Sequence, residues 1–275
     1  MASRSVFEFG LRATADLVMR SMADYIVSIQ FDEERLALMA RIDAIDFAAS
    51  RVLLWNDQPA GVALIARRGW TSRMALLALL PEARKQGLGS AFVRQLQREA
   101  RERGDRRMVL EVIEQNGPAV RLYDRCGFRR GRRLLGFRAE PIGSRGETRL
   151  HEIDLREVAA NVSRHPLFHD LPWQVSAETI GQLTPPNRGY GQNGAWAAAA
   201  SPAGPVVRVR ALAVSGEDLE AQAAAIAMLR GIRATYPSYP VEMIALWPEE
   251  GEAVWLAAGF KRNELSQFQL SYDFL

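Results

Sequence analysis

The sequence predicts an α/β protein made of two consecutive domains. Three observations support this. Apolar segments of strand length alternate with amphipathic helical segments. The segment 79–90 runs from an apolar strand through Pro81 into a turn with two glycines and then into a helix. Near the end of the second half, Gly259-Phe260 repeats Gly127-Phe128, which indicates a tandem repeat with domains at 1–153 and 154–275.

The expected elements of the first domain follow one another at short intervals. Amphipathic spacing predicts the helices, apolar runs predict the strands, and Asn56-Asp57 predicts a hairpin turn. In chain order we expect a strand at 7–12, helices at 14–29 and 32–41, a hairpin of 52–55 with 61–66, a strand at 73–80, a helix from 88 to Gly104, a strand at 108–112, a helix at 118–126 and closing strands from 127 to about 153.

The second half repeats this order less completely. We expect helices and loops over 155–205 with a strand at 195–200 and an interruption at 185–189, then a strand at 212–214, a helix over 217–236 and a strand at 241–247. Aligned on the Gly-Phe pair, Trp255 takes the place of Tyr123 and Pro248 that of Asn116. The segment 215–220 carries acidic residues in place of the glycine turn. We interpret the half as a repeat that kept the fold and lost the site. The alternative is that many α/β domains end in a helix and a Gly-Phe strand.

Composition limits the class of protein. The chain has 275 residues, 48% hydrophobic and 24% charged, so it can bury a sizeable core. A net charge of +3 does not require a polyanionic partner. The single cysteine, Cys126, has no partner for an intrachain disulfide, suits a reducing compartment, and lies on the apolar side of a helix end as a buried residue rather than a nucleophile. No leader and no apolar run of membrane-spanning length is visible, so we expect a cytoplasmic protein without a membrane partner.

The glycine turn has the chemistry of an anion site. Gly87 and Gly89 lack a Cβ, so consecutive main-chain N–H groups can face outward where the helix dipole favours negative charge. Arg84 and Lys85 add full positive charges. The spacing fits a diphosphate, although a helix entered through two glycines can also be only a turn.

Two strings together resemble the GCN5-related N-acetyltransferases, the GNAT family. The first is the run from Arg84 to Gly89, and the second runs from Asn116 to Phe128. The resemblance covers residues 5 to about 150. It implies a mixed, mostly antiparallel sheet flanked by helices in each tandem domain, and an acetyl-CoA cosubstrate held by the glycine turn. The sequence departs from the family at Lys85, where the family often has glycine.

The same resemblance implies which residues contact the coenzyme. The pantetheine arm would pair with the main chain around Leu79, as an added strand does. Tyr123 would protonate the departing thiolate as general acid, with packing as its alternative role. Asn116 is also expected to cap its helix. The implied coenzyme-binding residues are Leu79, Arg84, Lys85, Gln86, Gly87, Leu88, Gly89, Ser90, Asn116, Ala119 and Tyr123.

The base and the acceptor are less defined. Glu111 and Glu114 are the candidate general bases, and water with main-chain carbonyls is the alternative. Asp24, Tyr25 and Asp32 are positioned to attract a cationic amine, or they lie on solvated helix faces. The acceptor is a small-molecule amine or a peptide amine. A non-catalytic acyl-CoA sensor or interaction protein is the rival function.

Two other features of the sequence are weaker indications of function. His165 and His169 have the spacing of paired metal ligands, but Pro166 interrupts the helix and no third ligand accompanies them, so we expect no metal. We expect a monomer with an internal pseudo-dimer, or a homodimer. An arginine cluster is interpreted as a solvated face, with nucleic-acid binding as the alternative; its members are Arg121, Arg125, Arg129, Arg130, Arg132, Arg133 and Arg138.

Overall fold

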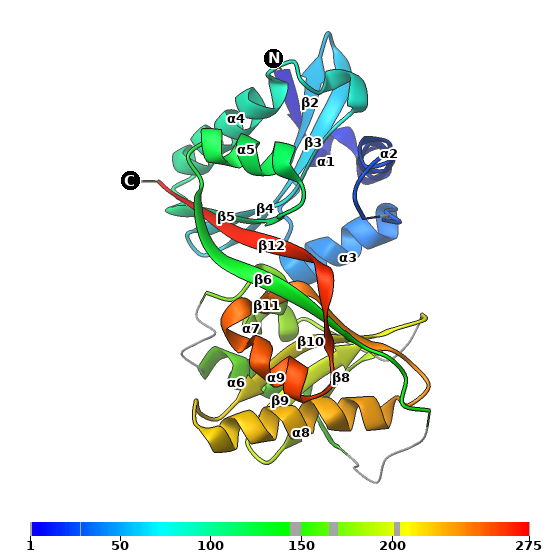
Figure 1. Ribbon diagram of the computed structural model, residues 1–275. Coiled ribbons are helices and arrows are strands. Elements are labelled where there is room, and N and C mark those ends of the chain that lie inside the picture. The colour runs from blue at the N-terminus through cyan, green and yellow to red at the C-terminus, as the bar shows by residue number, and fades with distance from the viewer. Residues whose placement is uncertain (1, 28, 144–149, 165–169, 201–203, 275) are drawn as a thin grey trace. The chain divides into compact units, whose positions relative to one another are not determined.

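The computed structural model describes residues 2–27, 29–143, 150–164, 170–200 and 204–274. It shows a mixed α/β fold with sheet flanked by helices (Figure 1). The chain divides into two compact units, Met1–Gly131 with Phe268–Leu275, and Arg132–Gln267. The sequence predicted the division after residue 153 and gave the chain's end to the second part. The catalytic and degenerate roles assigned to the two parts stay predictions.

Unit 1 contains a sheet with strand order β1-β2-β3-β4-β5-β12. The first four strands pair antiparallel, and β4 pairs parallel with β5. Asn56 and Asp57 both have positive φ, 50° and 60°, which is typical of the two-residue hairpin turn predicted there. The strands are β1 (Ala2–Ser5), β2 (Arg51–Trp55), β3 (Gln58–Arg68), β4 (Thr71–Leu79), β5 (Arg107–Ile113) and, from Phe268 onward, β12 (Lys261–Asp273).

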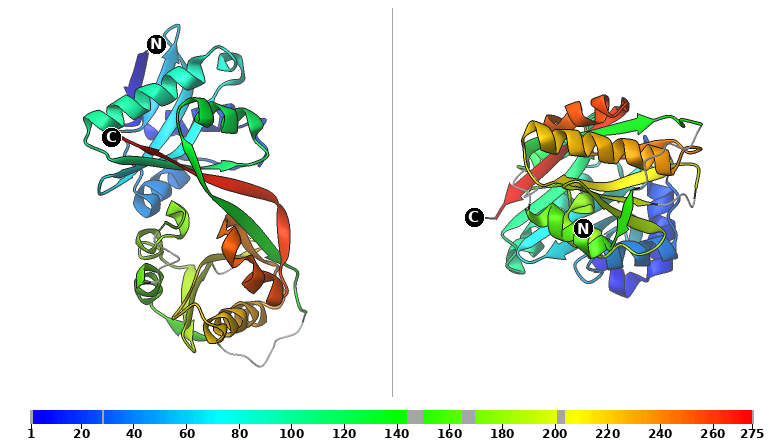
Figure 2. Two further views of the ribbon diagram at one scale, coloured as in Figure 1. Left: turned by 60° about the vertical axis from the view of Figure 1, so that its left-hand side comes forward. Right: turned by 90° about the horizontal axis from the view of Figure 1, so that it is seen from below.

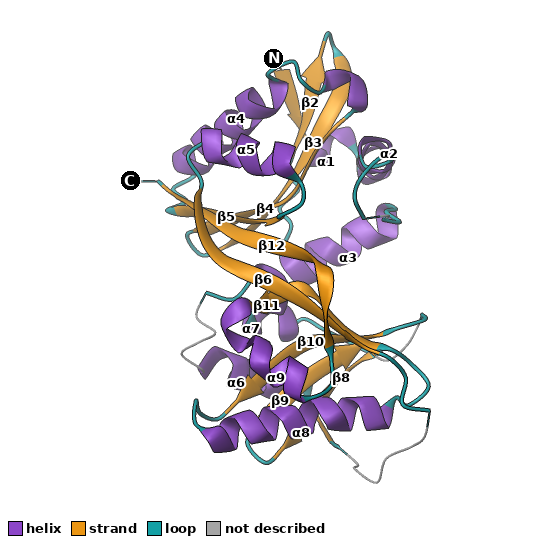
Figure 3. Cartoon of the chain, in the orientation of Figure 1, coloured by secondary structure: helices purple, strands orange, loops and turns teal. Residues whose placement is uncertain are grey.

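Helices flank this sheet. The two glycine-bearing strings predicted α4 and α5, which lie side by side in Figure 1, whereas α2 packs on β3 away from them (Figures 1 and 3). The helices of unit 1 are α1 (Val6–Phe9), α2 (Leu11–Ser21), α3 (Glu33–Asp43), the 3-10 turn η1 (Pro81–Ala83), α4 (Leu88–Glu102) and α5 (Gly117–Arg125).

The predicted strand at 7–12 is wrong, because a capping box starts a helix there. The Ser5 hydroxyl oxygen accepts from the Glu8 main-chain N–H at 3.2 Å, and the Glu8 carboxylate accepts from the Ser5 N–H at 3.0 Å. The helix expected over 14–29 also ends earlier, at Ser21.

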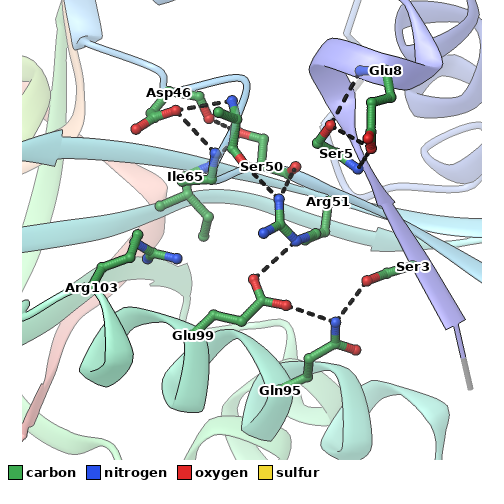
Figure 4. Close-up of polar contacts among 12 residues, drawn as sticks. Ser3, Ser5, Glu8, Asp46, Ser50, Arg51, Ile65, Gln95, Glu99 and Arg103 are labelled. Carbon is green, nitrogen blue, oxygen red and sulfur yellow. Dashed lines mark hydrogen bonds and ion pairs between the residues drawn. The ribbon is translucent and has the colours of Figure 1, made fainter.

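Polar contacts fix α4 to the N-terminal edge of the sheet (Figure 4). Glu99 of α4 pairs with Arg51 of β2 at 2.9 Å between carboxylate and guanidinium. Gln95, one turn earlier, donates to the Ser3 hydroxyl at 2.6 Å and to Glu99 at 2.8 Å. These contacts anchor the helix whose first turn follows the glycine turn.

Unit 2 has strand order β6-β11-β10-β9-β8-β7. Among the described strands of this unit, β10 pairs parallel with β11 and the others pair antiparallel. Trp255 is fully buried and stacks on Phe137, with ring centroids 5.2 Å apart. The strands are β6 (Arg129–Ala139, from Arg132), β7 (His151–Ile153), β8 (Asn187–Gln192), β9 (Ala195–Ala200), β10 (Val207–Val214) and β11 (Val241–Pro248).

The helices of unit 2 confirm the predicted long helix and show shorter ones around it. Figure 2 shows α8 as its longest helix. The described helices of unit 2 are α6 (Leu155–Arg164), η3 (Trp173–Val175), α7 (Ala177–Ile180), α8 (Leu219–Thr235), η4 (Glu249–Gly251) and α9 (Glu252–Ala257). Strand β8 lies partly in the stretch 185–189 that the sequence predicted as an interruption. No helix in the described ranges is long and apolar enough to cross a bilayer.

Each unit contains neighbouring strands that are far apart in sequence. In unit 1, β5 neighbours the end of β12, and the Phe274 N–H donates to the Arg106 carbonyl at 2.9 Å. In unit 2, β11 pairs with β6, with Val241 opposite Ala139. The boundary therefore differs from the predicted one, because strand pairing rather than sequence order decides which unit a closing strand joins.

Candidate active site

Strands β4 and β5 pair only at their amino-terminal ends, and we call the unpaired stretch beyond Arg73 and Val109 the slot. They are in parallel register only from Thr71 opposite Arg107 to Arg73 opposite Val109. The β3 register shifts just past this point, between Leu64 and Ile65. Such a bulge bends a strand and increases its twist, which separates β4 from β5.

The main chain of Leu79 faces this slot. Leu80 donates its N–H to the Ala60 carbonyl of β3 at 2.9 Å. Successive residues of a strand point their N–H and C=O groups to opposite edges, so Leu79 and Leu77 present theirs toward β5. This arrangement is consistent with the role predicted for Leu79.

Gly61 is a site residue that the sequence analysis missed. A Cβ there would lie 2.4 Å from Leu79 Cδ2 and 2.7 Å from the Ala78 carbonyl oxygen. Only glycine lets β3 approach β4 this closely. A glycine within a predicted strand was the available signal.

The turn between β4 and α4 displays free main-chain donors. Lys85 has φ 59° and Gly87 has φ 78°, and helix α4 begins at Leu88 with no side-chain cap. The N–H groups of Leu88, Gly89 and Ser90 have no partner inside the helix, and no described residue accepts from them. Lys85, Gln86 and Gly87 are exposed. The predicted anion site is therefore open to solvent.

The Arg84 side chain is committed elsewhere. Its guanidinium pairs with Asp24 and donates to the Ser21 carbonyl at 2.9 Å, and its Nε donates to the Leu79 carbonyl at 3.1 Å. This pairing raises the pKa of Arg84 and lowers that of Asp24. The charged group thus holds the turn against the end of α2, so Arg84 acts as a positioning residue, and Asp24 is already paired rather than waiting for a cationic amine.

Tyr123 lies on the buried side of α5, 7% exposed, with its ring edge-on to Phe128 at 5.6 Å. Burial raises the pKa of Tyr123 well above its usual value, and the neighbouring Tyr25 and Cys126 raise it further. The phenol therefore keeps its proton at neutral pH. A protonated, buried phenol is suited to donate that proton.

Asn116 links two elements of the site. Its side-chain oxygen accepts from the Ala119 N–H at 3.3 Å, which confirms the predicted helix cap. Its side chain also hydrogen-bonds Tyr25, which follows α2. Burial raises the pKa of Tyr25, and the bond to Asn116 opposes this shift. Tyr25 and Tyr123 thus flank one region near the start of α5.

Glu111 forms a buried ion pair with Arg73 at the point where β4 and β5 diverge. One carboxylate oxygen, Oε2, accepts from Arg73 at 2.7 and 2.8 Å, and the two side chains are 2% and 5% exposed. The other oxygen, Oε1, is buried with no hydrogen-bond partner among the described residues. Arg73 was not predicted, because the partners are far apart in sequence.

Glu114 lies in the turn between β5 and α5, half-buried. The pKa of Arg130 is raised first by its hydrogen bond to Asp124 and less by the charge of Glu114, which places Glu114 near that guanidinium. Glu114 is farther along the chain than the point where β4 and β5 diverge. Asp32, which the sequence analysis offered as a residue that attracts a cationic amine, caps α3. Its carboxylate accepts from the Arg35 N–H at 2.8 Å, so it has a structural role.

The remaining predictions concern the cysteine, a pair of histidines and the arginine cluster. Cys126 is 6% exposed, and burial raises the pKa of its thiol. No metal-holding group of His, Cys, Asp and Glu occurs among the described residues, and His165 and His169 lie outside them. The arginine cluster is broken up by ion pairs of Arg130 with Asp124, Arg133 with Glu249 and Arg138 with Glu140.

Comparison with known proteins locates one family match. The model of the acetyltransferase (GNAT) family matches residues 18–128. Streptothricin acetyltransferase from Streptomyces lavendulae is 35% identical over 71 residues, which cover 25% of this chain and 38% of that protein. The match thus spans well under half of that relative's length.

Three solved structures resemble nearly the whole chain. A putative acetyltransferase from Pyrococcus horikoshii has TM-score 0.64 and 10% identity, covering 100% of this chain and 89% of its own. A tandem GNAT protein from the clavulanic acid biosynthesis pathway has TM-score 0.62 and 16% identity, covering 95% and 94%. A GCN5-related N-acetyltransferase from Sphaerobacter thermophilus has TM-score 0.65 and 11% identity, covering 99% and 95%. At these identities the likeness concerns the fold.

Proposed function

Because residues 18–128 match the model of the GNAT acetyltransferase family, we propose that unit 1 transfers an acetyl group from acetyl-CoA to a primary amine. The observation that carries this proposal is the meeting of three features: the slot between β4 and β5, the uncapped start of α4, and the buried phenol of Tyr123. Each supplies one requirement of thioester aminolysis.

Coenzyme binding follows from the first two features. The free N–H groups of Leu88, Gly89 and Ser90 would donate hydrogen bonds to the diphosphate, with Lys85, Gln86 and Gly87 around it. The pantetheine arm would pair with the main chain of Leu79 in the slot, as an added strand does. A main-chain N–H there would also polarise the thioester carbonyl.

Tyr123 would act as the general acid. The amine nitrogen attacks the thioester carbon, the carbon–sulfur bond breaks, and Tyr123 gives its proton to the departing sulfur. The excess proton of the amine leaves to a base or to water and restores the phenol, so the products are an amide and free thiol. Asn116 and Ala119 form the start of the helix that positions Tyr123.

Glu111 is the better-placed general base of the two candidates. Its Oε1 is buried and has no described partner, while Arg73 holds Oε2 and fixes the carboxylate at the divergence of the strands. Glu114 lies in the turn beyond β5, near Arg130, and would need a longer water relay. The acceptor class remains a primary amine on a small molecule or a peptide.

Unit 2 would be a second copy of the fold without the chemistry. Its parallel pair β10 and β11 corresponds to β4 and β5, but Pro248 and Trp255 stand in place of Asn116 and Tyr123. Neither replacement can cap a helix with an amide or protonate sulfur with a phenol. We therefore assign turnover to unit 1 alone.

The test combines coenzyme binding with turnover. Calorimetry with coenzyme A should show one site per chain, and free thiol should appear when acetyl-CoA and a panel of amines are supplied. Tyr123→Phe should lower kcat about 100-fold or more, as expected for loss of a general acid, while coenzyme affinity stays within about twofold. Tyr239→Phe, at an exposed tyrosine of unit 2, is the matched control and should keep full activity.

Other outcomes separate the rival functions. Coenzyme binding without thiol release on any amine would favour the acyl-CoA sensor. Absence of coenzyme binding by the folded protein would overturn both. Equal turnover by Tyr123→Phe and the parent would remove Tyr123 from the chemistry and leave the transferase proposal in place.

A further inference from the structure

Unit 2 contains a partly enclosed cavity of about 240 Å³. It lies beyond the point where β10 and β11 diverge, since those strands are in register only at Val207 with Val241 and Arg208 with Glu242. The ends of both strands, the first turns of α8 and the start of α9 enclose it. The cavity therefore occupies in unit 2 the position that the slot occupies in unit 1.

The wall is apolar. Apolar side chains from four elements, β10, α8, β11 and α9, contribute to it: Leu212, Val214, Ala221, Ala225, Trp247 and Val254. At about 30 Å³ per water, the cavity has the volume of about eight water molecules, which is room for two fused aromatic rings. Native cores rarely keep open spaces of this size, because their side chains interlock closely.

Trp247 forms a wall that the chain holds in place. Its side chain lies close to Gly251, where an added Cβ would come within 2.4 Å of the indole nitrogen. The edge of its ring also meets Trp255, at 5.4 Å between centroids. Glycine at 251 thus permits the indole to line the cavity instead of filling it.

The charged side chains around the cavity are mostly acidic. Asp218 caps α8, its carboxylate accepting from the Ala221 N–H at 2.8 Å, so it occupies the helix end that would bind a phosphate. Glu217 and Glu250 also line the cavity and are exposed. Arg132 is the cationic side chain among the lining residues, so the two lining carboxylates outnumber it and disfavour a diphosphate or a carboxylate.

We propose that this cavity is a binding site for a compact apolar molecule that carries no anionic group. The site is separate from the coenzyme slot of unit 1 and does not depend on acetyl transfer. An aromatic or aliphatic ring system of bicyclic size would pack against Trp247 and the alanines of α8, with any polar or cationic substituent directed toward Glu217 and Glu250.

Three probes of similar shape and different charge test the ligand class on the full chain. They are 2-naphthylmethanol, 2-naphthylmethylamine and 2-naphthoate, each titrated by calorimetry. The alcohol and the amine should bind, and the naphthoate should bind at least tenfold more weakly. Absence of binding by the alcohol and the amine, or tightest binding by the naphthoate, would overturn the proposal.

Two variants on one helix locate the binding. Ala253 lines the cavity and is exposed, so Ala253→Leu should narrow the opening and weaken binding of the alcohol at least tenfold. Ala257 is also exposed on α9 but does not line the cavity, and Ala257→Leu should bind as the parent does. Equal affinity of the two variants, at matched thermal unfolding, would place the probe elsewhere.

A competition experiment with coenzyme A distinguishes this cavity from the slot of unit 1. Saturating coenzyme should leave the affinity for the alcohol unchanged, because the two sites belong to different units. Competition between them would assign the probe to the slot of unit 1 and overturn the proposal. A protein that fails to bind coenzyme but binds the alcohol would refute the transferase assignment and leave this site standing.

Discussion

Two parallel strand pairs of this chain both diverge after a few residues, but the helices that follow them begin differently. In unit 1, β4 and β5 diverge after three residue pairs, and in unit 2, β10 and β11 diverge after two. The helix after the first opening starts at Gly87 with no side-chain cap, whereas Asp218 caps the helix after the second. One helix end is therefore left for a ligand, and the other is satisfied by the protein itself.

The comparison shows that the fold provides the opening and a few residues decide what enters it. Free N–H groups and Lys85 suit an anion in unit 1, while an apolar wall with a mostly acidic lining would suit a molecule without an anionic group in unit 2. Tyr123 on α5 and Trp255 on α9 are both buried, and in the proposed mechanism only the phenol would deliver a proton to a thiolate. Function is thus a property of these positions rather than of the shared architecture.

The largest expected effect comes from giving unit 1 the cap that unit 2 has. Gly87→Asp places a carboxylate at the start of α4, where it would accept from the free N–H groups and repel phosphate. We expect coenzyme affinity to fall about 100-fold, because several charge-assisted hydrogen bonds are lost. Calorimetric titration with coenzyme A measures it.

Gly104→Asp is the matched control for this change. Gly104 also has positive φ, 84°, and open space around it, but it follows the other end of α4. It should carry the same backbone strain and bind coenzyme normally. Unchanged affinity in the Gly87 variant would show that the start of α4 does not hold the diphosphate.

The next effect concerns the close approach of β3 and β4. Gly61→Ala brings a Cβ against the Ala78 carbonyl, which cannot move without displacing β4. We expect the free energy of unfolding to fall by about 1–3 kcal/mol, as for other overpacked sites. Urea denaturation measures this, with Gly204→Ala, which meets nothing within 4 Å, as the control. Equal midpoints would mean that the strands can separate without cost.

The sequence predicted the local parts of this arrangement well. The glycine turn, helices α4 and α5 and the Asn116 cap each depend on neighbours within a few residues. The predicted strand at 7–12 failed because the Ser5 and Glu8 capping box outweighs a short apolar alternation. Interactions between residues a few positions apart therefore explain both the predictions that were confirmed and the one that was wrong.

Long-range pairing explains what the sequence could not predict. The exchange of β6 and β12 between units requires knowing which edge each strand meets, and no local pattern encodes that. The Arg73 and Glu111 ion pair joins two strands, and the Arg84 side chain turns from the expected phosphate to Asp24. A charged residue in a motif indicates the electrostatic potential of that region. The group with which the residue pairs depends on the fold.

A smaller effect tests the cap of unit 2. Asp218→Ala removes the acceptor for the Ala221 N–H and should cost about 1 kcal/mol of stability. Asp218→Asn keeps the cap without the charge and should cost less. Neither variant should gain a second coenzyme site by calorimetry, since no lysine or glycine turn accompanies α8. A second site in the alanine variant would mean that Asp218 alone separates the two units in function.

The smallest expected effect is a dependence of stability on alkaline pH that Tyr123 causes and Trp255 cannot. Burial first, and then Tyr25 and Cys126, raise the pKa of Tyr123 in the folded protein above the ordinary value of about 10 that holds in the unfolded chain. Above that pH the unfolded chain loses a proton that the folded protein keeps. The unfolded state then binds fewer protons, so the free energy of unfolding falls as pH rises, whereas below about pH 9 the contribution is complete.

Tyr123→Phe should therefore lose about 1 kcal/mol less stability than the parent between pH 8 and pH 11, measured by urea denaturation at each pH. Tyr239→Phe, at an exposed tyrosine, should follow the parent. An equal loss in the Tyr123 variant would mean that its hydroxyl reaches solvent in the folded state. The phenol would then be solvated rather than held protonated by burial, and the difference between Tyr123 and Trp255 would reduce to the presence of a hydroxyl.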